Sequence, residues 1–132
     1  MALKIQTSRK LDKITYTEGA GTATFHVKRL NQEETQECIE QATVYSWDAP
    51  DEVSKKERFE KINQILFMKL RFIKAVQSWD LEDEKGQPLE CNAENKGVVY
   101  ADHPHIANHI SKEMRKIEEA EAAQREKARK NS

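Results

Sequence analysis

Three histidines in the last third of the chain, His103, His105 and His109, have types and spacing that could bind a metal ion. Pro104 predicts the start of a helix, which would place His105 and His109 four residues apart on one face, with Glu113 one turn further along. Two imidazoles at this spacing chelate zinc, and a carboxylate completes such a site. The metalloprotease pattern needs a glutamate directly after the first histidine, and none is present here. The sequence therefore favours exposed histidines beside an apolar stripe over a metal site. If a metal ion binds here, His105 and His109 are the candidate ligands.

The two cysteines, Cys38 and Cys91, show no pattern typical of catalysis. They lie far apart with no Cys-x-x-Cys spacing, which is typical of reduced thiols in a cytosol-like compartment. Cys38 falls on the apolar face of an expected helix, where a buried thiol is inert. The acidic run 80–84 is typical of a solvated loop and lacks the ligand spacing of a calcium loop. We therefore expect no enzymatic activity and no cofactor.

The composition limits the kinds of partner. The chain has 132 residues, of which 34% are charged and 37% are hydrophobic, so the core is modest and the surface highly charged. The net charge of −1 gives no overall field for nucleic acid or an anionic membrane. The longest apolar window, Ile65–Ile73, is interrupted by Lys69 and Arg71, and the N-terminus lacks a signal peptide pattern. We expect a soluble, cytoplasmic protein without a nucleic-acid or membrane partner.

Two alternating segments near the N-terminus predict a β-hairpin. Lys13–Thr17 and Thr22–Leu30 are rich in β-branched and aromatic residues and flank the turn signal Glu18–Gly21. The two glycines of this turn lie between strands and not before a helix, so they predict a hairpin turn instead of a phosphate-binding loop. A hairpin alone is marginally stable in water. It must therefore pack on helices or on another chain.

Two helices are expected in the middle of the chain. Asn31 is a suitable N-cap for the first, which would bury Cys38 and end near Trp47. Pro50 marks the break before the second, a long amphipathic helix over residues 51–78 that supplies most of the core. Its expected apolar stripe consists of Phe59, Ile62, Ile65, Leu66, Leu70, Phe72, Ile73 and Val76.

The C-terminal part predicts a turn, a short helix and a final helix. The turn is expected at Glu84–Gly86, and Asn92 caps a short helix after it. The final helix opens at Pro104 and carries an apolar stripe of Ile106, Ile110, Met114 and Ile117. Residues 118–132 consist mainly of strong helix formers without large apolar side chains, which predicts a charged helical or disordered tail.

Together these patterns predict an α+β fold that is mainly helical. The N-terminal hairpin is expected to pack on the long central helix, with shorter helices flanking it and a charged helix or tail at the C-terminus. Residues 1–117 are expected to form a single domain, and residues 118–132 the tail.

Four apolar residues are candidates for binding a partner: Trp47, Phe67, Met68 and Trp79. Each tryptophan is either a core-edge aromatic with its N–H hydrogen-bonded, or an interface anchor, since tryptophan is enriched at binding hot spots. Phe67 and Met68 fall off the main stripe, towards the polar side of the helix. Either helices pack on the central helix from two sides, or Phe67 and Met68 contact another protein.

The order of these elements resembles a known family. A strand ending in Phe25–Leu30 leads directly into an acidic helix. A long helix then runs into Trp79-Asp-Leu-x-Asp-x-x-Gly-x-Pro-Leu89, and Glu94-Asn95 follows ahead of a C-terminal helix. This arrangement resembles the tail assembly chaperones of long-tailed bacteriophages and related prophages. The resemblance covers about Thr22 to Ile110.

The resemblance implies a non-enzymatic protein of the host bacterial cytoplasm. Such chaperones bind the tape measure protein and help bring tail tube protein to it, then leave before the tail is complete. Phe67, Met68 and the hairpin edge would suit either client binding or self-association as a homo-oligomer. The resemblance implies no catalytic residues.

Two other classes of non-enzymatic protein stay open, and a metal-dependent enzyme that uses His105 and His109 ranks after both. One is a small bacterial adaptor or protein-interaction module unrelated to phage. The other is a structural tail component, although such proteins tend to be β-rich, unlike the helical pattern expected here.

Overall fold

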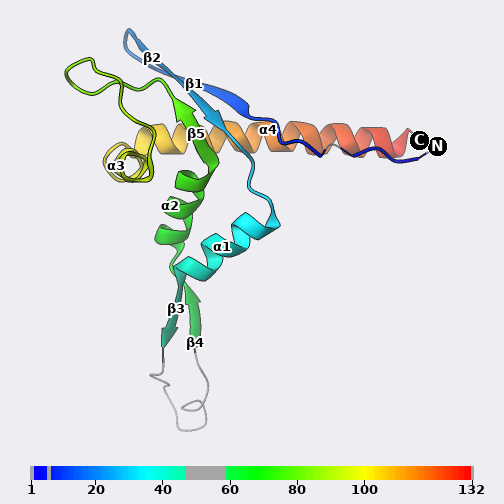
Figure 1. The fold of residues 1–132 in the computed structure, drawn as a ribbon. Coiled ribbons are helices and arrows are strands. Elements are labelled where there is room, and N and C mark those ends of the chain that lie inside the picture. Colours follow the sequence, from blue (N-terminus) through cyan, green and yellow to red (C-terminus); the bar gives the residue numbers. More distant parts are fainter. Residues whose placement is uncertain (1, 6, 47–58, 132) are drawn as a thin grey trace. The chain divides into compact units, whose positions relative to one another are not determined.

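The computed structural model describes residues 2–5, 7–46 and 59–131. The fold is α+β and mainly helical, as the sequence predicts (Figure 1). By internal contacts the chain divides into two compact units, one formed by Met1–Lys28 with Val76–Ser132 and the other by Arg29–Ala75. The elements in chain order are β1 (Asp12–Glu18), β2 (Gly21–Val27), α1 (Gln32–Ala42), β3 (Thr43–Ser46), β4 (Phe59–Ile62), α2 (Gln64–Ala75), β5 (Val76–Trp79), α3 (Ala93–Asp102) and α4 (Pro104–Lys130).

The first unit is built on a three-stranded antiparallel sheet with the order β1-β2-β5. The predicted hairpin is present: Glu18 pairs with Gly21 at the turn, and Ile14 lies opposite Phe25. Side chains alternate between the two faces of a strand, so one face of β1 and β2 carries the apolar residues. On that face Ile14, Ala23, Phe25 and Val27 are buried.

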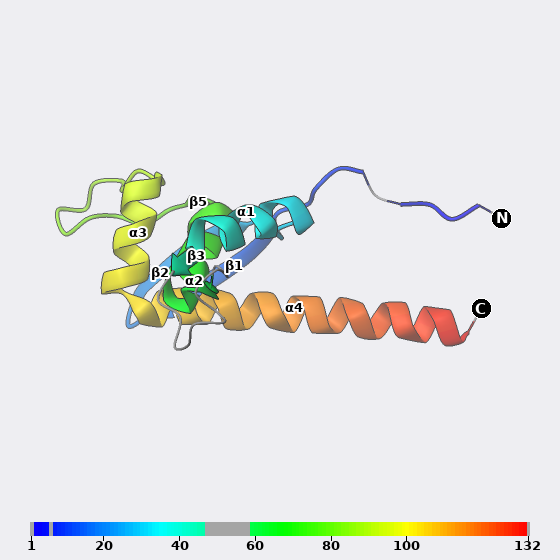
Figure 2. The ribbon, with the colours of Figure 1, turned by 90° about the horizontal axis from the view of Figure 1, so that it is seen from below.

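The two C-terminal helices complete this unit. α4 contacts β1 and buries Ile106, Ala107 and Ile110, which include the first two members of the predicted stripe. α3 packs on α4, and the Asn92 side chain accepts a hydrogen bond from the Asn95 N–H at 2.8 Å, as expected for an N-cap. Both views show α4 as one continuous helix that runs on to the C-terminus (Figures 1 and 2).

The second unit pairs two helices and a short hairpin. Asn31 forms the predicted cap of α1: its Oδ1 accepts from the Glu34 N–H at 2.9 Å, and Glu34 Oε1 accepts from the Asn31 N–H at 3.1 Å. α1 packs on α2 with Cys38 and Ala42 buried, and β3 pairs antiparallel with β4. The Asn63 Oδ1 accepts from the Leu66 N–H at 3.1 Å, which satisfies one donor in the first turn of α2.

The prediction of one long helix over residues 51–78 is wrong. The described part of that stretch is a strand at 59–62, a helix at 64–75 and a second strand at 76–79. The physical reason is strand pairing with distant segments, since β4 pairs with β3, and β5 pairs with β2. Val76 is fully buried in the sheet, so this part of the expected central helix instead adds a third strand to the hairpin, and the helix that packs on the hairpin is α4.

Two smaller predictions also change. The first helix ends at Ala42 instead of near Trp47, because the β-favouring residues Thr43–Ser46 form β3. Ile65 is expected in the apolar stripe of the central helix, but the structure leaves it 78% exposed, so that part of the prediction is wrong.

The C-terminal tail is helical where it is described. α4 extends to Lys130, so residues 118–130 continue the same helix that packs on β1. Basic residues Lys127, Arg129 and Lys130 occupy its last turn, where the helix dipole favours positive charge. The single domain over residues 1–117 stays a prediction.

Candidate functional site

The two candidate metal ligands lie on one face of α4, and that face contacts the edge strand β1. His109 Nε2 lies 2.9 Å from the carbonyl oxygen of Thr15. Because a carbonyl oxygen only accepts, the imidazole donates this hydrogen bond. Among the described strands β1 lies at the edge of its sheet, so its outward-facing backbone groups have no strand partner there. His109 therefore satisfies one edge carbonyl and fixes α4 against the sheet.

His105 contacts the same strand one turn earlier in α4. Its Nε2 lies 3.4 Å from Glu18 Oε1, and its ring centroid lies 5.9 Å from that of Tyr16. The Tyr16 hydroxyl donates to Glu18 Oε1 at 3.2 Å, and its ring packs edge-on against His109 at 5.3 Å. Partial burial, together with the adjacent Glu18 carboxylate, raises the pKa of Tyr16 above its usual value.

These contacts give the histidine face a structural role. Both Nε2 atoms are directed at groups of the hairpin, one at a backbone carbonyl and one at a carboxylate. Among the residues that the structure describes, no group of three or more His, Cys, Asp or Glu side chains is placed to hold a metal ion. In this geometry, His105 and His109 hold the first turns of α4 against the β-hairpin through these two contacts.

The motif of the family resemblance, from Trp79 to Asn95, runs from the end of β5 through a loop into the start of α3. The Trp79 indole N–H donates to the Leu89 carbonyl oxygen at 2.7 Å, and the Leu89 N–H donates to the Leu81 carbonyl oxygen at 2.9 Å. The Trp79 ring also packs edge-on against Phe25 at 6.2 Å. This confirms the expectation of a core-edge tryptophan with its N–H hydrogen-bonded.

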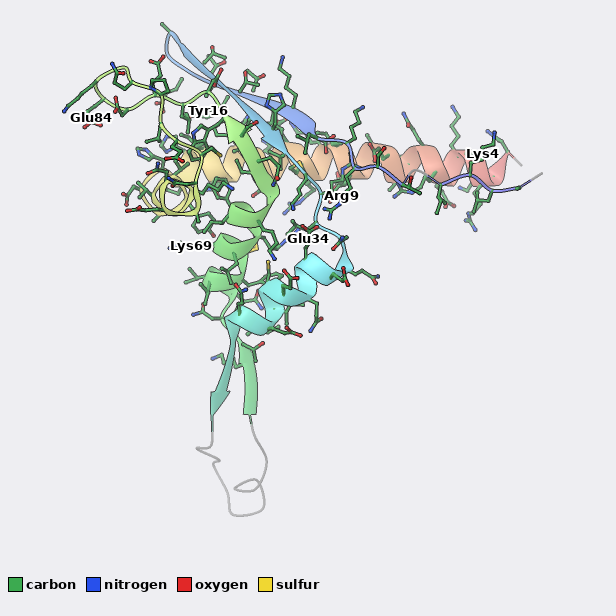
Figure 3. All side chains as sticks on the ribbon, viewed as in Figure 1. Lys4, Arg9, Tyr16, Glu34, Lys69 and Glu84 are labelled. Atoms are coloured by element: carbon green, nitrogen blue, oxygen red, sulfur yellow. The ribbon has the colours of Figure 1, made fainter. Side chains whose placement is uncertain are left out.

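The turn of this loop is organised by Asp83 and Gly86. Asp83 Oδ1 accepts from the backbone N–H groups of Lys85 at 2.9 Å and Gln87 at 3.0 Å. Gly86 has φ of +79°, a conformation that side chains with a Cβ rarely adopt. Figure 3 shows Glu84 at the outer end of this loop. The Asp-x-x-Gly spacing is therefore explained by turn formation alone.

The residues after the turn fix the start of α3. The Asn95 side-chain amide donates to the Glu90 carbonyl oxygen at 2.8 Å. Cys91, which precedes the Asn92 cap, is half-buried, and burial raises the pKa of its thiol. A raised pKa leaves less thiolate at neutral pH, so Cys91 is a poor nucleophile in this setting.

An open cavity of about 450 Å³ lies between the hairpin turn and the start of this loop. Its walls include Tyr16, Glu18, Asp80, Glu82 and Ile106. Asp80 is already engaged there, since its Oδ1 accepts from the Thr24 N–H at 2.6 Å and joins the loop to β2. The carboxylates on the wall would favour a cationic group over an anionic one.

The partner-binding candidates on α2 have different surroundings. Met68 is 41% exposed, whereas Phe67 is half-buried, with the Arg71 guanidinium carbon 5.7 Å from its ring centroid. The sequence reasoning missed Ile65, which is the more exposed apolar residue of the same helix. Trp47 lies outside the described residues. Partner binding by Trp47, Phe67, Met68 and Trp79 stays a prediction.

Comparison of the chain with family models, with curated protein sequences and with solved structures finds no match. Within the described residues, no helix has both the length and the apolar character needed to cross a membrane.

Proposed function

We propose that this chain is a non-enzymatic tail assembly chaperone of a long-tailed bacteriophage or prophage. In this proposal it acts in the host cytoplasm, where it binds the tape measure protein and brings tail tube protein to it. The resemblance of the segment from Trp79 to Asn95 to that family is the starting point. The role itself depends on a surface, because no catalytic residue is implied.

The observation that carries the proposal is the exposed apolar pair on α2. Ile65 and Met68 are 78% and 41% exposed and lie three residues apart, so they share a helix face. Exposed apolar residues that adjoin each other on a helix are typical of protein-binding surfaces. A chaperone that covers apolar segments of its client needs such a face.

The motif residues support the proposal in a second way. Trp79, Asp83, Gly86 and Asn95 each have a conformation or hydrogen bond that shapes the loop between β5 and α3. Residues of this kind recur within a family because they define its fold, without taking part in chemistry. The motif therefore bears on the resemblance in fold, and the binding role depends on the exposed apolar pair of α2.

The test is co-expression with the tape measure protein of a long-tailed bacteriophage, the client that the proposal names. We expect the native chain to raise the soluble fraction of that client, and Ile65→Ser combined with Met68→Ser to remove the effect. Val98→Ser is the matched control, because Val98 is an exposed apolar residue on α3. An unchanged solubility of the client with the native chain would contradict the proposal.

Purified virions separate the chaperone from a structural tail component. A chaperone leaves before the tail is complete, so the protein should be absent from finished particles by mass spectrometry. Its presence there in stoichiometric amounts would favour a structural component. Failure to co-purify with any tail protein would favour an adaptor unrelated to phage.

A further inference from the structure

The charges of the second unit are segregated between its two helices. α1 carries Glu33, Glu34, Glu37 and Glu40 without a lysine or arginine, while α2 carries Lys69, Arg71 and Lys74 without an acidic residue. The helices pack on each other, and Lys74 forms an ion pair with Glu37. Lys74 therefore serves the internal helix pair. Lys69 and Arg71 form no ion pair within the described residues, and the Arg71 guanidinium lies over the Phe67 ring, 5.7 Å from its centroid.

The position of Lys74 shows which side of α2 faces away from α1. Ile65 precedes Lys74 by nine residues, and at about 100° per residue this places the two on opposite sides of the helix. The high exposure of Ile65 agrees with this geometry. Figure 3 likewise shows Lys69 projecting from the side of α2 away from α1.

Both remaining cations border the exposed apolar pair. Lys69 follows Ile65 by four residues and Arg71 follows Met68 by three, so each cation is a surface neighbour of one apolar residue. Around the helix, Lys69 lies on the Ile65 side of the pair and Arg71 on the Met68 side. Phe72 lies between Ile65 and Met68 on this wheel but is buried, so the exposed face is confined to the first two turns of α2.

We propose that this face of α2, formed by Ile65 and Met68 between Lys69 and Arg71, binds an amphipathic helix of the client with acidic residues on both sides of its apolar stripe. The apolar pair supplies the contact area, and charge complementarity selects acidic over basic helices. The inference rests on the proposed function, because it specifies the client segment that α2 receives. The acidic face of α1 shows that this helix pair already uses the same charge match internally.

The direct test uses two designed peptides and the full-length protein. Each peptide is fluorescein-labelled and has about 18 residues, which is long enough to form a helix. Each has a stripe of leucines, which is flanked by glutamates in one peptide and by lysines in the other. We expect the glutamate peptide to bind in fluorescence anisotropy, and the lysine peptide to bind at least about tenfold more weakly. Raising the salt to about 0.5 M should weaken the glutamate peptide's binding, because surface charges are then screened.

Charge reversal supplies the specificity control. Lys69→Glu combined with Arg71→Glu should weaken the binding of the glutamate peptide by about tenfold or more and strengthen the binding of the lysine peptide. Lys112→Glu combined with Arg115→Glu changes the net charge equally at exposed positions on α4 and should change neither affinity. Ile65→Ser should weaken both peptides. Circular dichroism melts of each variant establish that it is folded.

Three outcomes would overturn the inference. In the first, the native protein binds both peptides equally well; in the second, it binds neither. In the third, the charge reversals on α2 and on α4 weaken the binding of the glutamate peptide to the same extent. Co-expression distinguishes this failure from failure of the proposed function. Suppose that the Lys69→Glu, Arg71→Glu variant keeps the client soluble and the Ile65→Ser, Met68→Ser variant does not. That result would contradict the charge preference and still support the chaperone role.

Discussion

His109 Nε2 donates a hydrogen bond to the carbonyl oxygen of Thr15 at 2.9 Å, and this contact joins two residues separated by 94 positions in the chain. It fixes the first half of α4 to the edge strand of the sheet. It also explains a histidine pair that by sequence could have been read as a metal-ligand motif. One imidazole satisfies the strand edge and the other lies next to the Glu18 carboxylate.

We expect His109→Ala to destabilise the protein by about 1 kcal/mol, because an edge carbonyl loses its donor and the Tyr16 ring loses a neighbour. Urea denaturation followed by circular dichroism measures the change. His103→Ala is the control, since His103 is exposed and its only ring contact among the described residues is with His105. Equal losses in the two variants would show that the Thr15 hydrogen bond contributes nothing specific.

We expect Trp79→Phe to lower the free energy of unfolding by about 1–2 kcal/mol, because the ring is largely kept while the Leu89 carbonyl loses its hydrogen bond. Trp79→Ala should cost more, about 3 kcal/mol or above, since the contact with Phe25 is lost as well. Chemical denaturation of both variants provides the comparison. If the Trp79→Phe variant were as stable as the native protein, the indole N–H hydrogen bond would not contribute to the stability of this loop.

We expect stability to fall above about pH 10, in part through Tyr16. The folded state raises the pKa of Tyr16, so its contribution is present below the unfolded pKa and is lost as the pH rises through the folded value. Lys74, whose pKa is raised by its hydrogen bond to Glu37, acts in the same alkaline window and with the same sign.

Thermal melts of the native protein and of Tyr16→Phe between neutral pH and about pH 11 test this prediction. The variant should lose stability less steeply at alkaline pH. Tyr100→Phe is the matched control for a general effect of removing a phenol. If the stability of the native and Tyr16→Phe proteins fell in parallel as the pH rose, Tyr16 would not contribute to the alkaline loss of stability.

We expect Gly86→Ala to destabilise the protein by about 1 kcal/mol, because φ of +79° is strained for any residue with a Cβ. Open space surrounds the site of the added Cβ, so the cost is conformational and not steric. Gly21→Ala is the control, because Gly21 has no positive φ and its added Cβ would make an ordinary contact of 3.5 Å with the Glu18 carbonyl oxygen. Midpoints of urea unfolding compare the two, and a larger loss at Gly21 would count against this reasoning.

The sequence by itself determined the parts of this protein that depend on neighbouring residues. The Asn31 and Asn92 caps, the hairpin turn before Gly21 and the turn at Gly86 all lie where the pattern predicts them. Each is set by a short-range preference, such as a side chain that satisfies a helix end or a glycine that adopts a positive φ.

Only the tertiary structure decided what became of the stretch from Phe59 to Trp79. Its helical periodicity corresponds to a helix only over Gln64–Ala75. The segments on both sides form strands because they pair with strands elsewhere in the chain. Val76 pairs opposite Val27, and no local window of sequence contains both. The roles of His109 and Ile65 followed in the same way, since strand pairing and helix packing between distant segments outweigh local periodicity.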